Sequence, residues 1–473
     1  MLSARRLLWA AVAAYAAAFA TLSVLRDRAF QTGRFDLGNM VQAVWSTAHG
    51  HPLRITELGG DQISRLAAHV DPILVVFAPL WWIWPSPHLL LVGQAIAIAV
   101  GALPVFWLAR KHLDSDNAAL GFALAYLLLP AVQWLTLNEF HPVALAAPLL
   151  LFAFWFLDED RLAPFALFAL LACACKEEIP LVVAGFGIWY ALARRRYAAG
   201  AAIAGAGAAW AALAIGVVIP HYNHGASSSF YSRYSEVGGS PRGVLQTAVT
   251  HPWRLVEKAL GHRGVHYLIQ LALPLAALWA AAPLVLIAAL PDLAVNLLSA
   301  TPTQTSIHFH YTAGIVPPLV VASVLGAARL RGRIRPATLA ALAVAAALVG
   351  NYRLGAIPLW SELPGGQGFQ ANATQVSAHD RIALRALKTI PDGVVVTASN
   401  SLGAHLSDRR RILSFPYVQD ATWIAADETV PGWADRLAPI PAATALARLR
   451  RNPAWKLVFE QDGVLVFRRI LPP

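Results

Sequence analysis

The chain opens on residues 7–38, which read LLWAAVAAYAAAFATLSVLRDRAFQTGRFDLG. Residues 7–25 carry no charged side chain and match the length of one transmembrane helix, which needs about 20 largely apolar residues. The motif Arg34-Phe35-Asp36-Leu37-Gly38 follows soon after. A carboxylate just outside the first span, in a chain that otherwise avoids charge, indicates a functional site at the membrane surface.

The rest of the chain repeats this apolar pattern. Of its 473 residues, 57% are hydrophobic and only 13% are charged, whereas soluble domains carry about 25% charged residues. Apolar blocks lie near 7–25, 71–84, 87–109, 117–135, 142–157, 162–175, 179–193, 198–219, 266–281, 283–299, 311–328 and 336–350. The sequence therefore predicts an α-helical polytopic membrane protein with about eleven spans. Residues 1–20 mimic a secretory signal, but the apolar run continues to Leu25, so we expect an uncleaved first span.

Basic residues assign the loops to the two sides of the membrane. If Arg5 and Arg6 face the cytoplasm and residues 71–84 do not cross, the short cytoplasmic segments hold twelve Lys or Arg residues and the short outer turns hold only Lys176. The positive-inside rule then places the polar region after residue 354 outside. The net charge of +11 is thus explained by topology. No nucleic-acid motif occurs, and we expect no nucleic-acid partner.

Two parts are predicted on this basis. Residues 1–354 form a transmembrane domain with larger outer loops at 26–70 and 220–265, and residues 355–473 form an extracytoplasmic soluble α/β domain. In the second part, helices are expected at 378–389 and 442–450 and strands at 394–397, 412–415 and 421–425. A hairpin is expected at 456–460 and 464–468, because Asp462-Gly463 is a typical turn pair.

Unusual polar residues collect on the predicted outer side, and each has a structural alternative. Asp36 could cap a helix over 37–48, Asp71-Pro72 could start a helix, and Glu139 to Pro142 could form a solvated turn. Lys176, followed by Glu177 and Glu178, breaks the positive-inside pattern and needs a fixed anionic partner, either a neighbouring glutamate or a ligand phosphate.

Metal and cofactor chemistry has little support in the sequence. Cys173 and Cys175 are the only cysteines, too few for a disulfide framework or a four-ligand zinc site. His308 and His310 stand at alternate positions, without further ligands at a recognisable spacing. We expect no cofactor and no obligatory metal; a bound divalent metal is the less favoured alternative.

Several motifs resemble those of one protein family. They are Phe35-Asp36-Leu37-Gly38, Gln42-Ala43-Val44-Trp45, His69-Val70-Asp71-Pro72, Lys176-Glu177-Glu178, Leu290-Pro291-Asp292, His310-Tyr311 and His405-Leu406-Ser407. The chain resembles an uncharacterised family of bacterial polytopic membrane proteins, catalogued as a domain of unknown function. That family is similar in layout to the GT-C superfamily of membrane glycosyltransferases, which use polyprenyl-phosphate sugars and carry an acidic residue in the first outer loop.

This resemblance implies a GT-C-like fold and an enzyme. The expected reaction moves a sugar from a polyprenyl-phosphate donor, held against membrane lipid, to a glycan, lipid or protein acceptor at the extracytoplasmic face. Asp36 is the candidate general base, and Lys176, helped by His308 and His310, is the candidate ligand of the donor phosphate. Candidate contacts to the sugar or acceptor are Asp71, His69, Glu139, His141, Glu177 and Tyr311.

Two other functions fit the same residues less well. A transporter or flippase of a lipid-linked or polar solute would use the charges as a pathway, but it should show polar residues at mid-bilayer and broken helices in matched halves. A non-catalytic membrane scaffold would leave Asp36 and Lys176 unexplained.

Overall fold

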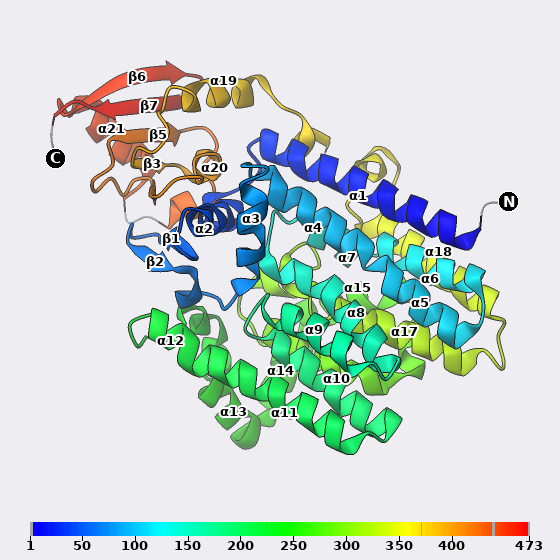
Figure 1. Cartoon of the computed structure of the whole chain (residues 1–473). Helices are drawn as coiled ribbons and strands as arrows, with labels where there is room; N and C mark the ends of the chain where they lie inside the picture. The colour runs from blue at the N-terminus through cyan, green and yellow to red at the C-terminus, as the bar shows by residue number, and fades with distance from the viewer. Residues whose placement is uncertain (1–2, 227, 370, 438–439, 472–473) are drawn as a thin grey trace.

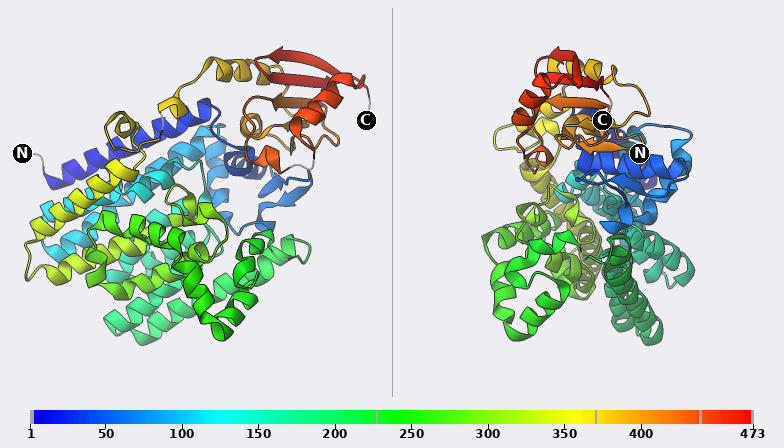
Figure 2. Two further views of the ribbon diagram at one scale, coloured as in Figure 1. Left: turned by 180° about the vertical axis from the view of Figure 1, so that it is seen from behind. Right: turned by 90° about the vertical axis from the view of Figure 1, so that its left-hand side faces the viewer.

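The computed structural model describes residues 3–226, 228–369, 371–437 and 440–471. Most of the chain to residue 354 is a helical bundle, and the remainder carries a five-stranded sheet at the end opposite the N-terminus (Figure 1). Figure 2 shows the same arrangement from two further sides, with the sheet above the bundle and α11 to α14 on its far side. The chain is a multi-pass membrane protein, as its composition predicts.

The first half of the bundle contains the site-bearing segments. Its elements are α1 (Ala4–Arg28), the π-helical turn η1 (Arg34–Gly38), α2 (Asn39–Ala48), β1 (Arg54–Thr56), β2 (Gln62–Ser64), η2 (Arg65–Ala67), η3 (Pro72–Phe77), α3 (Ala78–Trp81), α4 (His88–Val100), α5 (Ala102–Leu113), α6 (Asp116–Leu128), α7 (Pro130–Leu137), η4 (Pro142–Leu145), α8 (Ala146–Asp158) and α9 (Leu162–Cys173). Ser3 caps α1 by accepting the Arg6 N–H at 3.4 Å.

The second half begins with a helical hairpin and continues through many short turns. Its elements are α10 (Ile179–Arg194), α11 (Tyr197–Leu213), η5 (Ala214–Val218), α12 (Ile219–Tyr222), η6 (Ser229–Val237), α13 (Pro241–Thr250), α14 (Pro252–Ala259), α15 (His262–Ala272), η7 (Leu273–Leu275), η8 (Leu278–Ala281), η9 (Pro283–Ala289), α16 (Leu290–Leu297), η10 (Pro302–Thr305), η11 (His310–Thr312), α17 (Val316–Leu330) and α18 (Pro336–Leu354).

Two apolar blocks that were expected to be continuous are broken. The block at 117–135 bends by 49° between α6 and α7, because Pro130 has no N–H to continue the hydrogen-bond ladder. The block at 266–281 leaves the α-helical path after Ala272, and Ala276 and Ala277 adopt φ values of 53° and 54°. Apolar composition alone does not report such breaks, since the flanking side chains remain equally hydrophobic.

The number of membrane spans stays a prediction. Within the described residues, four helices are long and apolar enough to cross a membrane, or five if the bent pair α6–α7 is one span. Shorter apolar helices add further candidates at Pro72–Trp81, Pro142–Asp158, Leu162–Cys173, Ile179–Arg194, Pro283–Leu297 and Val316–Leu330. The block at 71–84 forms a short element over 72–81, part 3-10 helix and part α-helix, and whether it crosses the membrane stays a prediction.

The C-terminal sheet follows the predicted order of helices and strands. Its strands are β3 (Val396–Ala398), β4 (Ile412–Ser414), β5 (Trp423–Asp427), β6 (Trp455–Gln461) and β7 (Val464–Arg469), in the spatial order β4-β3-β5-β7-β6. Strands β4, β3 and β5 are parallel, and β7 and β6 are antiparallel additions. The predicted hairpin is confirmed, and Asp462 and Gly463 in its turn have positive φ values of 49° and 76°.

Helices cover both faces of this sheet. Helix α19 (Ala378–Leu387) packs Ile382 and Ala386 against one face, and α21 (Ala442–Arg451) packs Leu446 against the other. A third, short helix, α20 (Asn400–Ala404), follows β3 and packs against η1 of the bundle. The described elements of this region are completed by η12 (Pro358–Glu362), η13 (Ala371–Thr374) and η14 (Ala434–Arg436).

Loops that the sequence assigns to the cytoplasm lie together at the end of the bundle remote from the sheet. Lys111 Nζ pairs with Asp158 Oδ2 at 2.7 Å, linking the α5–α6 and α8–α9 connections. Arg194 Nη2 pairs with Asp158 Oδ1 at 3.3 Å, and Arg331 Nη1 donates to the His112 carbonyl at 2.6 Å. The basic residues are therefore collected at one end, as a consistent topology requires.

We predict that this basic end faces the cytoplasm. In a variant with Cys173 and Cys175 replaced, a cysteine introduced at exposed Arg195 should resist a membrane-impermeant thiol reagent in intact cells. A cysteine at exposed Asp392 should react readily. Labelling of position 195 from outside would place the Asp36 side of the protein in the cytoplasm and remove the basis for an extracytoplasmic reaction.

Candidate functional site

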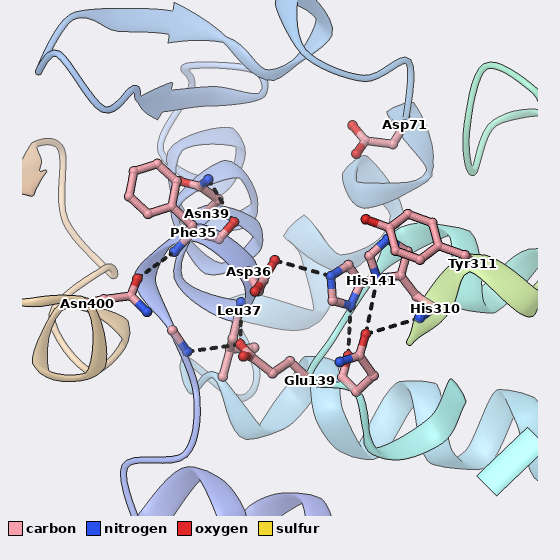
Figure 3. Close-up of polar contacts among 12 residues, drawn as sticks. Phe35, Asp36, Leu37, Asn39, Asp71, Glu139, His141, His310, Tyr311 and Asn400 are labelled. Atoms are coloured by element: carbon pink, nitrogen blue, oxygen red, sulfur yellow. Dashed lines mark hydrogen bonds and ion pairs between the residues drawn. The ribbon is translucent and has the colours of Figure 1, made fainter. Parts of the chain in front are cut away.

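Asp36 lies in a π-helical turn between α1 and α2. The turn η1 begins after Gly33, and the Asp36 side chain is 35% exposed. Its carboxylate faces His141 rather than a helix N-terminus (Figure 3). The alternative that Asp36 caps the following helix is therefore wrong. Single-turn π segments often occur at functional sites, because they turn one side chain out of the regular helical pattern.

Glu139 holds this turn from the bundle side. Its Oε2 accepts the Gly33 N–H at 3.0 Å and the Leu37 N–H at 2.9 Å, so one carboxylate oxygen spans the segment that carries Asp36 (Figure 3). Burial, followed by the nearby Asp36 charge, raises the pKa of Glu139 to about 8. Glu139 thus orients the turn and is not simply solvated, although a helical turn, η4, does start at Pro142 as the turn alternative supposes.

The C-terminal region supports the turn from the other side. Asn400 Oδ1 accepts the Phe35 N–H at 3.4 Å. Side chains of the C-terminal region approach the turn closely: a Cβ on Gly33 would stand 2.6 Å from Asn400 Nδ2, and one on Gly38 would stand 2.6 Å from Ser407 Oγ. A larger residue at either position would therefore have to displace the Asn400 or the Ser407 side chain.

Arg34 fixes the same contact with a buried guanidinium. Its Nη2 donates to the carbonyls of Thr56 at 2.7 Å and Ile412 at 2.8 Å, and its Nη1 donates to Ser414 Oγ at 2.8 Å. One side chain therefore joins the first outer loop to strand β4. Burial lowers the pKa of Arg34 to about 9, which shows how strongly it is withdrawn from water.

A row of stacked rings leads away from Asp36, and we call it the ring row: His141, His310 and Tyr311. His141 Nε2 lies 3.4 Å from Asp36 Oδ1, a long contact. The His141 and His310 rings stack with centroids 3.7 Å apart, and the His310 and Tyr311 centroids are 4.2 Å apart. Asn138 fixes both imidazoles: its carbonyl lies 2.7 Å from His141 Nδ1, and its Oδ1 lies 3.1 Å from His310 Nδ1.

Charged residues surround the far end of the ring row. Lys176 Nζ lies 5.7 Å from the centre of the Tyr311 ring and pairs with Glu178 Oε1 at 2.5 Å. Both side chains of the pair are only 14% exposed. Burial lowers the pKa of Lys176, but Glu178 and Glu177 outweigh burial and leave it above its ordinary value. The glutamate alternative for its partner is thus realised in this structure.

Glu177 turns to the other side and contacts the first outer loop. Its Oε1 lies 2.8 Å from His69 Nδ1, and its Oε2 accepts the Val70 N–H at 3.0 Å. Burial raises the pKa of Glu177, but His69 and Lys176 outweigh it and hold the pKa at about 2. Glu177 therefore remains a carboxylate and ties the loop carrying His69 to the turn carrying Lys176.

Two predicted residues lie apart from the ring row. Asp71 is buried and pairs with Arg65 through Nε and Nη2, both at 2.9 Å from Oδ2. The Asp71 side chain makes no cap bond with η3, which starts at Pro72 within the described chain. His308 packs edge-on against Trp134, with centroids 4.7 Å apart, and its Nδ1 lies 3.1 Å from Ser306 Oγ.

Four further residues shape the site but were not predicted: Arg34, Asn138, Asn400 and Arg233. Arg233 comes from η6 in the outer loop at 220–265, and its Nη1 donates to Tyr311 Oη at 3.3 Å. The run Phe230-Tyr231-Ser232-Arg233-Tyr234, a cation among aromatic residues, was the available signal. Arg34 and Asn400 offered none, because their roles depend on a contact across more than 360 residues.

The expectation that the protein needs no metal stays a prediction. Among the described residues, no group of three or more His, Cys, Asp or Glu side chains is arranged to hold a metal ion. The carboxylates of the site are instead engaged by backbone N–H groups, histidine, lysine and arginine. Whether the reaction depends on a metal stays a prediction.

Glu139→Gln should change the pH dependence of stability. A carboxyl whose pKa is raised from 4.5 to about 8 stabilises the folded state fully below pH ~4.5, and that contribution is lost as the pH rises through ~8. The variant keeps an acceptor oxygen for Gly33 and Leu37 but should lack this loss. Thermal unfolding midpoints from pH 4.5 to 8.5 measure it, with exposed Glu362→Gln as control. Parallel profiles for wild type and Glu139→Gln would contradict the assignment.

The chain is similar to one protein family and to solved structures of one membrane protein. The family model described as "Predicted membrane protein (DUF2079)" matches residues 26–466. No curated protein matches. ArnT from Cupriavidus metallidurans, solved bound to undecaprenyl phosphate, is similar with a TM-score of 0.54 and 12% identity, over 97% of each chain. Its apo state gives a TM-score of 0.50 and 12% identity, over 96% of this chain and 97% of that chain.

At 12% identity this likeness concerns the fold, and it confirms the GT-C-like architecture expected from the sequence. The family match covers both the first outer loop and the C-terminal sheet, so the two parts that meet at η1 lie within one family model. The chain therefore belongs to the DUF2079 family of predicted membrane proteins.

Proposed function

We propose that this protein is a membrane glycosyltransferase that moves a sugar from a polyprenyl-phosphate donor to an acceptor at the extracytoplasmic face. One observation carries the proposal: a partly exposed carboxylate stands at one end of the ring row and a lysine at the other. The fold likeness to ArnT, solved with undecaprenyl phosphate, supports a lipid-phosphate donor for this chain too. The basic end of the bundle supports the choice of face.

Asp36 acts as the general base in this reaction. The acceptor hydroxyl oxygen attacks the sugar carbon, the bond from that carbon to the phosphate oxygen breaks, and the hydroxyl proton passes to Asp36. The phosphate leaves with the bonding electron pair, so the configuration at the sugar carbon inverts. Glu139 and Asn400 hold the turn carrying Asp36, which keeps the carboxylate within reach of the acceptor without blocking it.

Lys176 and the histidines receive the departing phosphate. Burial, followed by His141 and Lys176, lowers the pKa of His310, so its imidazole is neutral and donates or accepts a hydrogen bond without adding charge. Lys176 must loosen its contact with Glu178 to bind the phosphate closely. His308, which faces Trp134, would contribute only after a side-chain movement.

Sugar and acceptor hydroxyls have polar partners along the same row. We assign this role to His141, Tyr311, His69 and Glu177, which lie around the ring row or on the loop beside it. Asp71 would have to leave its ion pair with Arg65 to join them. Glu139 contributes through the turn that it holds, with its remaining oxygen available to a hydroxyl.

Asp36→Asn should abolish transfer while leaving the protein folded. The substitution keeps the size of the side chain but removes the base, and loss of a general base typically costs ~10²–10⁴ in rate. Transfer of a radiolabelled sugar from a polyprenyl-phosphate donor in proteoliposomes measures it. Asp61→Asn, an exposed change in the same outer segment, is the matched control and should keep wild-type turnover. Near-normal turnover by Asp36→Asn would show that Asp36 is not the base.

Lys176→Met should weaken donor binding, but the variant also leaves the buried Glu178 without its ion-pair partner. Removing one partner of a buried ion pair costs ~3–5 kcal/mol of stability. The double variant Lys176→Met/Glu178→Gln should recover most of that stability and still bind a polyprenyl-phosphate analogue about 10-fold or more less tightly. Wild-type affinity in the double variant would reduce Lys176 to a structural ion pair.

A further inference from the structure

Arg233 differs from the other cation beside Tyr311. Lys176 is paired with Glu178, whereas the guanidinium of Arg233 has no carboxylate within 4.0 Å among the residues that the structure describes. Neighbouring acids are already engaged: Glu177 pairs with His69, and Glu236 pairs with Lys258. The positive charge of Lys176 is therefore compensated, and that of Arg233 is not.

The side chain is held in place by aromatic groups. Its Cζ lies 4.5 Å from the centre of the Phe230 ring, and its Nη1 donates to Tyr311 Oη at 3.3 Å. Phe230 in turn stacks on His69, with centroids 4.8 Å apart. Cation–π contact orients a guanidinium without neutralising it, so within the described residues the other N–H donors of Arg233 remain available to bind an anion.

The helical turn that carries Arg233 is docked across the site. The Arg233 carbonyl accepts the Ala300 N–H at 2.7 Å, Tyr234 Oη donates to the Val295 carbonyl at 3.1 Å, and Gln304 Nε2 donates to Tyr234 Oη at 3.3 Å. Phe230, Arg233 and Tyr234 thus face the segments around His69, Tyr311 and α16. The outer loop at 220–265 reaches the ring row through η6.

We propose that Arg233 is a donor-binding residue that recognises the phosphate of the lipid-linked sugar, so that η6 is a donor-recognition element. The inference rests on the proposed function and adds to it a residue from a loop that the sequence analysis left without a role. A guanidinium offers five N–H donors in a planar fork that matches phosphate oxygens, and only one is used toward Tyr311 within the described residues. A single uncompensated cation suits the single charge of a phosphodiester.

Arg233→Gln tests this assignment by binding rather than turnover. The ligands are a short-chain polyprenyl phosphate and the corresponding uncharged polyprenol, measured with purified full-length protein in detergent. We expect the variant to bind the phosphate about 10- to 100-fold more weakly than wild type and the alcohol equally well. Arg242→Gln, an exposed change on α13, is the matched control, and Arg233→Lys should retain part of the phosphate affinity. The salt dependence of phosphate binding should also fall in Arg233→Gln.

The outcomes separate this inference from the function on which it rests. Equal phosphate affinity in wild type and Arg233→Gln would overturn the role of Arg233 and leave the glycosyltransferase proposal standing. Equal loss of phosphate and alcohol binding would also overturn it, because Arg233 would then only hold η6 in place. A wild-type protein that binds the phosphate no better than the alcohol would instead refute the lipid-phosphate donor itself.

Discussion

The position of the Asp36 carboxylate depends on how the turn from Gly33 to Gly38 is held between two parts of the chain. Glu139, in the bundle, accepts hydrogen bonds from the backbone of this turn, and Arg34, within the turn, donates one to the Ile412 carbonyl in strand β4. A buried guanidinium that lost these carbonyls would be left unpaired in a poorly solvating environment, which costs several kcal/mol. The turn can therefore adopt few other positions while both contacts persist.

This double attachment makes the C-terminal sheet part of the site's framework. Helix α20 meets η1 at Asn400, whose side chain a Cβ on Gly33 would displace, and the ring centroids of Phe35 and Trp433 are 5.9 Å apart. A displacement of the sheet region would remove these contacts and leave Asp36 oriented from one side only. The two regions are thus mechanically linked, although the sequence separates them into a transmembrane and a polar part.

The sequence predicts the helices and strands of this structure better than the breaks within helices and the number of membrane spans. Apolar blocks, the Asp462-Gly463 hairpin and the helices at 378 and 442 follow from local patterns that a single segment contains. The bend at Pro130 and the break after Ala272, which is followed by Pro274, each have a proline as their sequence signal, but apolar composition alone shows neither. Span number also remains open, since short apolar helices do not distinguish crossing from re-entrant paths.

For the site, the sequence indicates which residues take part but not which partners they have. Polar groups beside apolar blocks are costly, and this cost selected Asp36, His141, His310, Tyr311 and Lys176. In the structure these five residues lie along or beside the ring row. Their electrostatic state was not readable, since it depends on partners brought together by folding. Lys176 pairs with Glu178, two positions away, whereas Arg233 contacts Tyr311, 78 residues further along the chain, and has no carboxylate within 4.0 Å among the described residues.

The resulting charge distribution suits the direction of the proposed reaction. Electron density moves from the acceptor oxygen through the sugar carbon to the phosphate oxygen, while a proton leaves the acceptor. The Asp36 carboxylate stands at one end of the ring row, and the Arg233 cation stands at the Tyr311 end. A donor lying along the row would place its phosphate toward Arg233 and the attacking hydroxyl toward Asp36. Because these groups are fixed before the reaction, they stabilise the developing charges without a reorganisation cost.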